Sequence, residues 1–458
     1  MCAEPARATI AKAPPAGAGE TAKASPADGH ASGTAPLADG AASGKAPVGE
    51  PATVAVGLLG HGTVGAAFAE LLAERAEAIG RLTGRTPYID GVLRRGSGSF
   101  EEILERSEVI VELIGGLEPA RTYVLAAMRA GRQVVTANKQ LLCEHGEELF
   151  EAARRHGVGL RFEAAVAGVV PVIKVLAESL PGIEVRRIYG IVNGTTNFIL
   201  SAMERGASYE QALAEAQVRG FAEADPTEDV TGRDAAAKMA ILARLAFDTP
   251  VSLEQVQYEG IEQLSLDDIE HARDLGLGLK LVGAVERLGD GLSVRVHPAF
   301  LYAGHPLASV TGSYNAVTVE AEAITEITMS GPGAGGRQTA SAVLGDLVSA
   351  ISKAPPAFVP LLPPRPLRLV TDTASAFYLH IEVADRPGVL VAIAAVLDAF
   401  EVSIKSVMQR GLEENARLVM VTHALAESRL RAAVEKIGEL EFVRSPPRAI
   451  RVIEEEFT

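Results

Sequence analysis

Cysteine and tryptophan are nearly missing from this chain of 458 residues, which has two cysteines, Cys2 and Cys143, and no tryptophan. Two cysteines build neither a disulfide framework nor a cysteine-ligated zinc centre. Long apolar runs are missing too, since none reaches the about 20 residues of a transmembrane helix. Basic residues are in deficit, and the formal net charge is −15, whereas a nucleic-acid binder presents a basic face. We therefore expect a cytoplasmic protein with neither a nucleic-acid nor a membrane partner.

The composition that remains is globular, with 48% hydrophobic and 22% charged residues. A chain of this length exceeds a single hydrophobic core, so two to four domains are expected. Residues 1–50 differ from the rest, because they consist mainly of Ala, Gly, Pro, Ser and Thr. Such a segment buries too little apolar surface to offset the entropy of ordering it. We predict a disordered tail, which lacks the apolar core of a secretory signal.

The folded part begins with ATVAVGLLGHGTVG, residues 52–65. A β-branched strand leads into a glycine loop, and an Ala- and Leu-rich helical pattern follows. This order favours a dinucleotide-binding fingerprint made of Gly60, Gly62 and Gly65, with Thr63 and Val64 in the same loop. The glycines permit a tight turn and a close approach of backbone amides to a pyrophosphate at the helix N-terminus. A glycine turn of some other α/β domain is the alternative.

The second strand should end in YIDGVLRR, residues 88–95. An NAD site usually offers an acid there to the ribose 2′-hydroxyl, and an arginine suits a 2′-phosphate instead. This strand end carries Arg94 and Arg95 and no acid. The pattern therefore favours NADP(H) over NAD(H), unless the two arginines are ordinary surface residues.

The α/β pattern continues with a strand at 109–114, a helix ending at Gly131 and a short strand in QVVTANKQLL. Lys139 follows that strand, and the carboxyl end of a parallel strand faces the crevice where such sheets bind ligands. A further apolar strand, in VGLRFEAAVAG, contains Glu163. An acid in such a strand needs a partner, because burying it unpaired is costly.

The stretch GFAEADPTEDVTGRDAAAK, residues 220–238, combines five carboxylates with one lysine. If GRDAAAKMAILARLAF is a helix, Asp234 and Lys238 stand at positions i and i+4 on one face. One interpretation is a surface salt bridge worth about 0.3–0.5 kcal/mol. The other is a pocket that binds a cationic group and positions one lysine.

The C-terminal part starts with a proline-rich stretch at 354–370, which predicts an extended linker. The pattern after it reads strand, helix, strand, strand, helix, strand over 376–452. This order resembles an ACT domain, the ferredoxin-like module that binds amino acids. Asp385-Arg-Pro-Gly-Val-Leu390 matches the first turn of that module, where free helix amides can meet a carboxylate. A purely structural appendage is the alternative.

From about residue 53 to 352 the chain resembles the homoserine dehydrogenases. Seven segments appear in the order of that family: GLLGHGTVG, VIVELIGG, VVTANKQLL, FEAAVAG, GIVNGTTNFIL, the signature within 216–238 and GPGAGGRQTASAVLGDL. The resemblance implies reversible NAD(P)H-dependent reduction of L-aspartate 4-semialdehyde to L-homoserine, in threonine, methionine and isoleucine biosynthesis. It also implies an α/β fold divided into a Rossmann domain at 51–180, an α+β substrate and dimerisation domain at 181–330, a closing helix at 331–353 and the ACT domain.

The resemblance assigns roles residue by residue. Lys238 is implied as the proton donor to the carbonyl oxygen, and Lys139 as the second lysine near the nicotinamide. Glu223 and Asp234 are implied to bind the substrate, with Asp229 supporting them. The implied cofactor contacts are the glycine loop, Arg94, Lys139, Gly220 and Gly335. In GIVNGTTNFIL the glycine and hydroxyl residues after a strand predict a loop, and the resemblance places its residues Asn193 to Asn197 near the active site. A sodium site is implied at Glu163, Val166, Gly168 and Val170, unless Glu163 only satisfies loop amides.

The resemblance further implies L-threonine as an amino-acid effector and a homodimer or homotetramer. A monofunctional enzyme is expected, because 50 tail residues cannot hold a fused kinase domain. Two other functions stay open at this point. One is a Rossmann oxidoreductase acting on a different amino-acid semialdehyde, and the other is an inactive amino-acid sensor.

Overall fold

The computed structural model describes residues 51–352, 364–412 and 414–453. The predicted tail at 1–50 and residues 354–363 of the predicted linker lie outside these ranges. No helix in the described ranges is long and apolar enough to cross a membrane.

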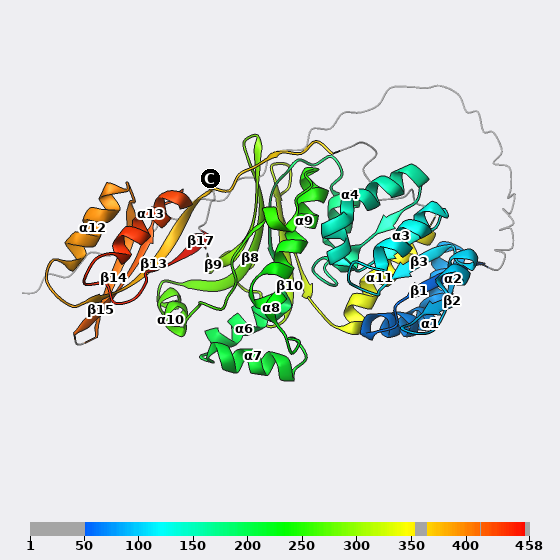
Figure 1. Ribbon diagram of the computed structural model, residues 1–458, viewed down its shortest axis with the longest axis horizontal. Helices are drawn as coiled ribbons and strands as arrows, with labels where there is room; N and C mark the ends of the chain where they lie inside the picture. The colour runs from blue at the N-terminus through cyan, green and yellow to red at the C-terminus, as the bar shows by residue number, and fades with distance from the viewer. Residues whose placement is uncertain (1–50, 353–363, 413, 454–458) are drawn as a thin grey trace, which may run out of the picture. The chain divides into compact units, whose positions relative to one another are not determined.

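The first sheet is built from five parallel strands in the order β2-β1-β3-β4-β5. Helices connect them and cover them (Figure 1), which explains why the central strands read as continuous apolar runs. The strands are β1 (Ala52–Leu59), β2 (Arg85–Leu93), β3 (Val109–Glu112), β4 (Gln133–Thr136) and β5 (Leu160–Arg161). The helices are α1 (Thr63–Thr83), α2 (Phe100–Arg106), α3 (Ala120–Arg129) and α4 (Lys139–His156).

The helix α11 (Gly336–Ile351) returns to this sheet from far along the chain. Figure 1 shows it in yellow beside the blue α1. Val343 and Leu347 of α11 share a buried cluster with Phe68 and Leu72 of α1. Helix α11 therefore completes the hydrophobic core on one side of the first sheet.

Two strands of this sheet are shorter than their sequence pattern indicates. The predicted strand at 109–114 stops at Glu112, whose carboxylate accepts hydrogen bonds from the amides of Ile114 (2.8 Å) and Gly115 (3.2 Å). These two amides donate to the side chain of Glu112 and therefore do not pair with a neighbouring strand. Glu163 is not in a strand either, because β5 ends at Arg161 and Glu163–Ala165 forms a 3-10 turn.

The second sheet is larger and has the order β11-β10-β6-β8-β9-β17-β13-β15-β14. Helices α6, α9 and α10 pack against β8, and α9 also contacts β9. The strands of its first half are β6 (Val185–Ile191), β8 (Leu277–Leu288), β9 (Gly291–Tyr302), β10 (Tyr314–Ala321) and β11 (Thr325–Pro332). The helices of this half are α6 (Gly194–Glu204), α7 (Tyr209–Val218), α8 (Thr227–Val230), α9 (Arg233–Phe247) and α10 (Leu266–Asp274).

Short elements complete this part of the chain. Between β5 and β6 lie the α-helical turn Val172–Lys174 and the π-helical turn Val175–Ser179. A 3-10 turn, Leu253–Gln255, precedes β7 (Gln257–Tyr258), and β12 (Arg368–Leu369) follows the undescribed residues. Both β7 and β12 pair in parallel with β9.

The C-terminal region shows the predicted alternation of elements. It consists of β13 (Ala374–Ala384), α12 (Val389–Ala399), β14 (Ile404–Leu412), β15 (Asn415–Thr422), β16 (Leu425–Ala426), α13 (Glu427–Gly438) and β17 (Arg448–Ile453). Its main strands have the order β17-β13-β15-β14, and α12 packs on α13 (Figure 1). This is the expected ferredoxin-like ACT arrangement.

The ACT strands extend the second sheet, because β17 pairs in parallel with β9 and places Arg451 opposite Ala299. Charged residues of α10 add to the contact. Asp268 is fully buried and lies 2.9 Å from Nδ1 of His380 and 3.0 Å from a guanidinium nitrogen of Arg448. The ACT region therefore touches the preceding region through a strand edge and through buried charges.

Candidate active site

The glycine loop after β1 has the geometry that a dinucleotide fingerprint requires. Gly60 adopts a φ of +97°, and a Cβ there would lie 2.4 Å from the carbonyl oxygen of Leu113. A Cβ on Gly65 would lie 2.2 Å from the carbonyl oxygen of Gly60. Gly62 caps α1, which begins at Thr63. The three glycines thus leave space beside the N-terminal amides of α1. A pyrophosphate could approach these amides closely.

The loop before α11 lies against the same turn. Gly335 is the residue that caps α11, and a Cβ on Gly336 would lie 2.9 Å from the Thr63 side chain. Val64 follows as a half-buried residue at the start of α1. The structure therefore brings Gly335 next to the fingerprint, although its position is 270 after that of Gly65.

The two arginines lie where β2 meets the glycine loop. β2 ends at Leu93, within the predicted stretch 88–95, and the carbonyl of Leu93 accepts a hydrogen bond from the amide of Gly60 (3.0 Å). Arg94 and Arg95 follow directly and are exposed. They lie at the carboxyl end of β2, next to the glycine loop.

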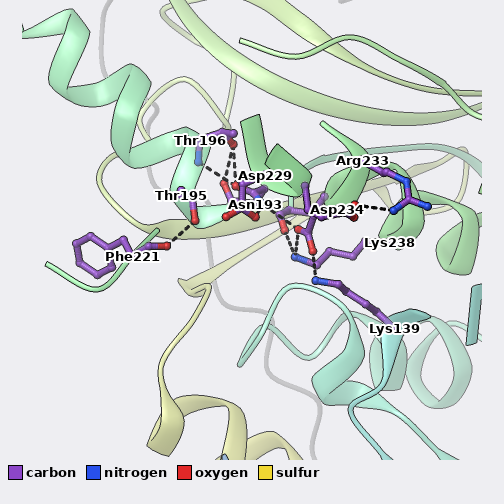
Figure 2. Close-up of polar contacts among 11 residues, drawn as sticks. Lys139, Asn193, Thr195, Thr196, Phe221, Asp229, Arg233, Asp234 and Lys238 are labelled. Carbon is purple, nitrogen blue, oxygen red and sulfur yellow. Dashed lines mark hydrogen bonds and ion pairs between the residues drawn. The ribbon is translucent and has the colours of Figure 1, made fainter. Parts of the chain in front are cut away.

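The two predicted lysines meet on one carboxylate. Lys139 is the first residue of α4, and its Nζ forms an ion pair with Oδ1 of Asp234. Lys238 approaches the other oxygen, with Nζ 2.7 Å from Oδ2 of Asp234 and 2.6 Å from the carbonyl oxygen of Val192. Figure 2 shows both ammonium groups pointing at Asp234 from different elements. Asp234 is only 3% exposed, so this arrangement is not a surface salt bridge.

Asn193 links the acids of the cluster. Its amide nitrogen donates to Asp229 (2.7 Å) and to Asp234 (2.9 Å), while its oxygen accepts from the amide of Thr196 at the start of α6 (Figure 2). The segment GIVNGTTNFIL is therefore a strand followed by a capped helix, and the expectation of a loop was wrong. Asparagine at a helix N-cap is a readable signal, whereas the Val192 carbonyl leaves no trace in the sequence.

The charges of this cluster shift the pKa values of one another. Burial by itself would raise the pKa of Asp234, but the ammonium groups of Lys238 and Lys139 outweigh it and hold that pKa well below its ordinary value. Burial opposes the charge on Lys139, yet Asp234 raises the pKa of that lysine above its ordinary value. Burial, together with the nearby charge of Asp234, raises the pKa of Asp229. Asp234 is thus ionised and Lys139 cationic at neutral pH.

Glu223 and Gly220 were also predicted as site residues, but neither belongs to this hydrogen-bonded cluster as the described residues form it. Glu223 is exposed on the stretch between α7 and α8, and its backbone carbonyl accepts from Gln217 (3.2 Å). Gly220 has a φ of +74° in the turn that ends α7. The sequence could not distinguish Glu223 from Asp229 and Asp234, because all three are acids. They differ in burial, since Glu223 is exposed, Asp229 is half-buried and Asp234 is buried.

The predicted cation ligands lie in one tight loop. The carboxylate of Glu163 accepts the amides of Ile173 and Lys174, both at 2.9 Å. Burial, with the nearby Asp346, raises the pKa of Glu163 to about 7. Val166, Gly168 and Val170 continue the loop; Gly168 has a φ of +67°, and a Cβ on it would lie 2.4 Å from the Gly333 carbonyl oxygen. Among the described residues, no group of three or more His, Cys, Asp or Glu side chains could hold a metal ion.

Comparisons with known proteins agree with this geometry. Residues 60–163 match the family model described as the NAD binding domain of homoserine dehydrogenase, and residues 171–348 match the homoserine dehydrogenase model. A homoserine dehydrogenase of Corynebacterium glutamicum is 41% identical over 430 residues, which cover 88% of this chain and 96% of that protein. One from Mycobacterium tuberculosis strain H37Rv is 42% identical over 432 residues, covering 87% and 97%. The chain belongs to the homoserine dehydrogenase family.

Solved structures of the family extend the match to the whole fold. The crystal structure of a homoserine dehydrogenase from Thiobacillus denitrificans has a TM-score of 0.83 and 37% identity, covering 88% of this chain and 98% of that one. A hyperthermophilic archaeal homoserine dehydrogenase in complex with NADPH has a TM-score of 0.58 and 29% identity, covering 66% of this chain and 99% of that one. Residues 377–442 match the ACT domain. The protein is a homoserine dehydrogenase, an NAD(P)-dependent oxidoreductase acting on a CH–OH group, with a C-terminal ACT domain.

Proposed function

We propose that Lys238 is the proton donor when the carbonyl of L-aspartate 4-semialdehyde is reduced to the alcohol of L-homoserine. The observation that carries this proposal is the half-buried placement of its ammonium group, held by Asp234 and by the Val192 carbonyl. In the reduction, a proton leaves Nζ of Lys238 for the carbonyl oxygen and Nζ becomes neutral. In the oxidation the neutral amine takes the hydroxyl proton, so the same group serves both directions.

Lys139 acts on the same oxygen as a second cation. Negative charge develops on the carbonyl oxygen during the reduction, and a preorganised pair of ammonium groups stabilises it. Asp234 fixes both groups, because each lysine bonds to a different carboxylate oxygen. The cofactor, when bound, supplies or accepts the hydride, and the protein holds the reactants in place.

The acids of the cluster bind the substrate in this proposal. The α-ammonium group of the substrate needs a carboxylate partner, and Asp229 with Asp234 lies next to the lysines. Glu223 joins them only if the exposed stretch between α7 and α8 folds inward on substrate binding. Its exposed position in the structure makes it the weakest member of the predicted set.

NADP(H) is the proposed preferred cofactor. The loop of Gly60, Gly62, Thr63, Val64 and Gly65 would hold the pyrophosphate, with Gly335 and Gly220 as further predicted contacts. Arg94 supplies a guanidinium group for a 2′-phosphate, which an arginine binds through paired hydrogen bonds. The NADPH complex of the archaeal relative is consistent with this preference.

A sodium ion is proposed at the loop of Glu163, Val166, Gly168 and Val170. One carboxylate and backbone carbonyls form an oxygen-only ligand set, which suits a hard cation. Glu163 already bonds two backbone amides, so only its remaining lone pairs would contribute. Such an ion would stabilise this loop, which lies against the backbone of Gly333 shortly before the start of α11.

Regulation and assembly complete the proposal. L-threonine is the proposed feedback effector of the ACT domain, and the chain is expected to form a homodimer or homotetramer in the cytoplasm. The proposed division is a Rossmann domain at 51–180, a catalytic domain at 181–330, a closing helix at 331–353, a linker at 354–370 and the ACT domain at 376–452. The pathway implied is threonine, methionine and isoleucine biosynthesis.

The decisive assay follows cofactor absorbance with L-aspartate 4-semialdehyde as the substrate. Oxidation of NADPH at a higher kcat/KM than NADH would support both the reaction and the preference. Initial rates measured against L-threonine concentration test the effector. An enzyme that oxidises NADPH only with a different aldehyde would overturn the substrate assignment.

A further inference from the structure

Two polar side chains face each other at the carboxyl ends of neighbouring strands in the first sheet. Glu112 is the last residue of β3 and Thr136 is the last residue of β4, and the strand register pairs them. Both side chains are fully buried, and the Thr136 hydroxyl donates to Oε2 of Glu112 (2.6 Å). Parallel sheets bind ligands outside the carboxyl ends of their strands, so this pair lies at the edge that carries the glycine loop.

The carboxylate of Glu112 acts only as an acceptor. Its second oxygen, Oε1, accepts from the amides of Ile114 (2.8 Å) and Gly115 (3.2 Å), so all three of these partners are donors. The preceding residue, Val111, is apolar and fully buried. Burying a carboxylate is costly compared with an apolar side chain of similar size, so the acid at this strand end is better explained by the groups it holds in place.

Thr136 extends these contacts to the helix that carries Lys139. The Thr136 hydroxyl oxygen accepts from the amide of Asn138 (3.0 Å). Asn138 caps α4 with its side-chain oxygen, and its Nδ2 donates to the carbonyl of Gly116 (2.7 Å). Lys139 is the first residue of α4. The hydrogen bonds therefore run from Glu112 through Thr136 and Asn138 to the start of this helix.

The loop that Glu112 holds also lies against the glycine fingerprint. The amide of Leu113 donates to the carbonyl of Leu59 (2.7 Å). A Cβ on Gly60 would lie 2.4 Å from the carbonyl oxygen of Leu113 and 2.8 Å from the amide nitrogen of Ile114. Because the two backbones are in such close contact, a displacement of this loop would displace the fingerprint turn as well.

We propose that Glu112 and Thr136 are positioning residues for Lys139. Through Asn138 they set where the start of α4 places this lysine against Asp234, and Glu112 in addition holds the loop beside the fingerprint. A misplacement of about 1 Å caused away from the reacting atoms can lower a rate by about 100-fold. This inference rests on the proposed role of Lys139 as a second cation, and it identifies what holds that cation in place.

The first variants remove and restore the Thr136 hydroxyl. Thr136→Val keeps the shape of the side chain and should lower kcat by about 10–100-fold. The Kd for NADPH in a fluorescence titration should stay within about twofold, because Glu112 still holds the loop amides. Thr136→Ser keeps the hydroxyl and should bring kcat back to within about threefold of the wild type.

Thr318→Val is the matched control for these variants. Thr318 lies in β10, is only 1% exposed, and its hydroxyl forms a hydrogen bond with that of Thr328 (2.8 Å). The control therefore loses a buried strand hydroxyl outside the proposed site. Its kcat should stay within about twofold of the wild type, whereas its thermal midpoint should fall as it does in Thr136→Val.

Acetylation of Lys139 in the cofactor-free enzyme reports its position independently of activity. Acetic anhydride attacks neutral amines, and Asp234 raises the pKa of Lys139 although burial opposes the charge. A shifted α4 weakens this ion pair, so a larger fraction of the amine is neutral. The rate measured by mass spectrometry should rise at least about threefold in Thr136→Val, relative to the exposed Lys436 as an internal reference. Thr136→Ser and Thr318→Val should leave this ratio within about twofold.

Glu112→Gln breaks the same hydrogen bond from the other side, because an amide nitrogen does not accept the Thr136 proton. It should lower kcat and raise Lys139 acetylation in the same way. The double variant with Thr136→Val should stay within about threefold of the slower single variant, since both changes remove one shared contact.

Wild-type acetylation of Lys139 in both single variants would overturn the positioning, whatever happens to kcat. An equal loss of kcat in Thr318→Val would overturn it too, because the effect would then be one of stability alone. Lys139→Ala separates this inference from the function on which it rests. If Lys139→Ala keeps the wild-type kcat while acetylation responds as expected, the proposed role of Lys139 is wrong and its positioning by Glu112 and Thr136 stands.

Discussion

Replacing Lys238 with alanine tests the centre of the proposed mechanism. The change removes two polar contacts, one to Asp234 (2.7 Å) and one to the Val192 carbonyl (2.6 Å). Asp234 keeps its ion pair with Lys139 and its hydrogen bond from Asn193, so the buried carboxylate is not left alone. Loss of one general acid lowers turnover by about 10²–10⁴-fold. This corresponds to about 3–5.5 kcal/mol in the barrier at 1.36 kcal/mol per factor of ten.

The assay measures kcat in both directions, with Arg155→Ala as the matched control. Arg155 also forms an i,i+4 ion pair, with Glu151 on α4, but both side chains are exposed. Its removal should change kcat by less than about twofold, since surface pairs contribute about 0–1 kcal/mol. Added primary amines should partly restore turnover in Lys238→Ala, because they occupy the vacated space and carry a proton. A variant that keeps more than half of the wild-type turnover in both directions would refute the role of Lys238.

Three further predictions concern the cofactor and the charge cluster. Replacing both Arg94 and Arg95 with alanine should weaken NADPH binding and leave NADH binding nearly unchanged; equal losses for both cofactors in a fluorescence titration would show that the arginines serve the fold. Gly65→Ala places a Cβ 2.2 Å from a carbonyl oxygen, and overpacking of about 1–3 kcal/mol should raise the Kd for either cofactor by about 5–150-fold, so an unchanged Kd would contradict the fingerprint geometry. Asp234→Asn should lower the thermal midpoint at neutral pH. Burial favours the neutral acid, but Lys238 and Lys139 lower the pKa of Asp234, so its stabilisation is present above about pH 3.9 and is lost as pH falls through the lowered pKa. The difference from wild type should therefore shrink below about pH 4, and a constant difference would show that the carboxylate charge is irrelevant.

The local features of this protein were readable from the sequence. Gly60 and Gly65 were identified because a left-handed turn and a close backbone contact exclude side chains, and both requirements act within a few residues. The spacing of Asp234 and Lys238 on one helix face follows from helix periodicity. The ACT order of strands and helices followed from the same local periodicities. Family motifs then indicated which side chains to propose for the chemistry.

Only the tertiary structure decided which of those groups meet. Lys139 and Asp234 are 95 positions apart, and their ion pair depends on how α4 docks on α9. Glu223 and Asp229 look alike in the sequence, yet burial separates them, because it depends on what packs above each position. The hydrogen bond from Lys238 to the Val192 carbonyl and the pairing of β17 with β9 are made by backbone groups. Backbone groups are chemically the same at every residue, so the sequence does not indicate these contacts. The sequence therefore determined which groups are available, while long-range packing determined their partners, their burial and their charge state.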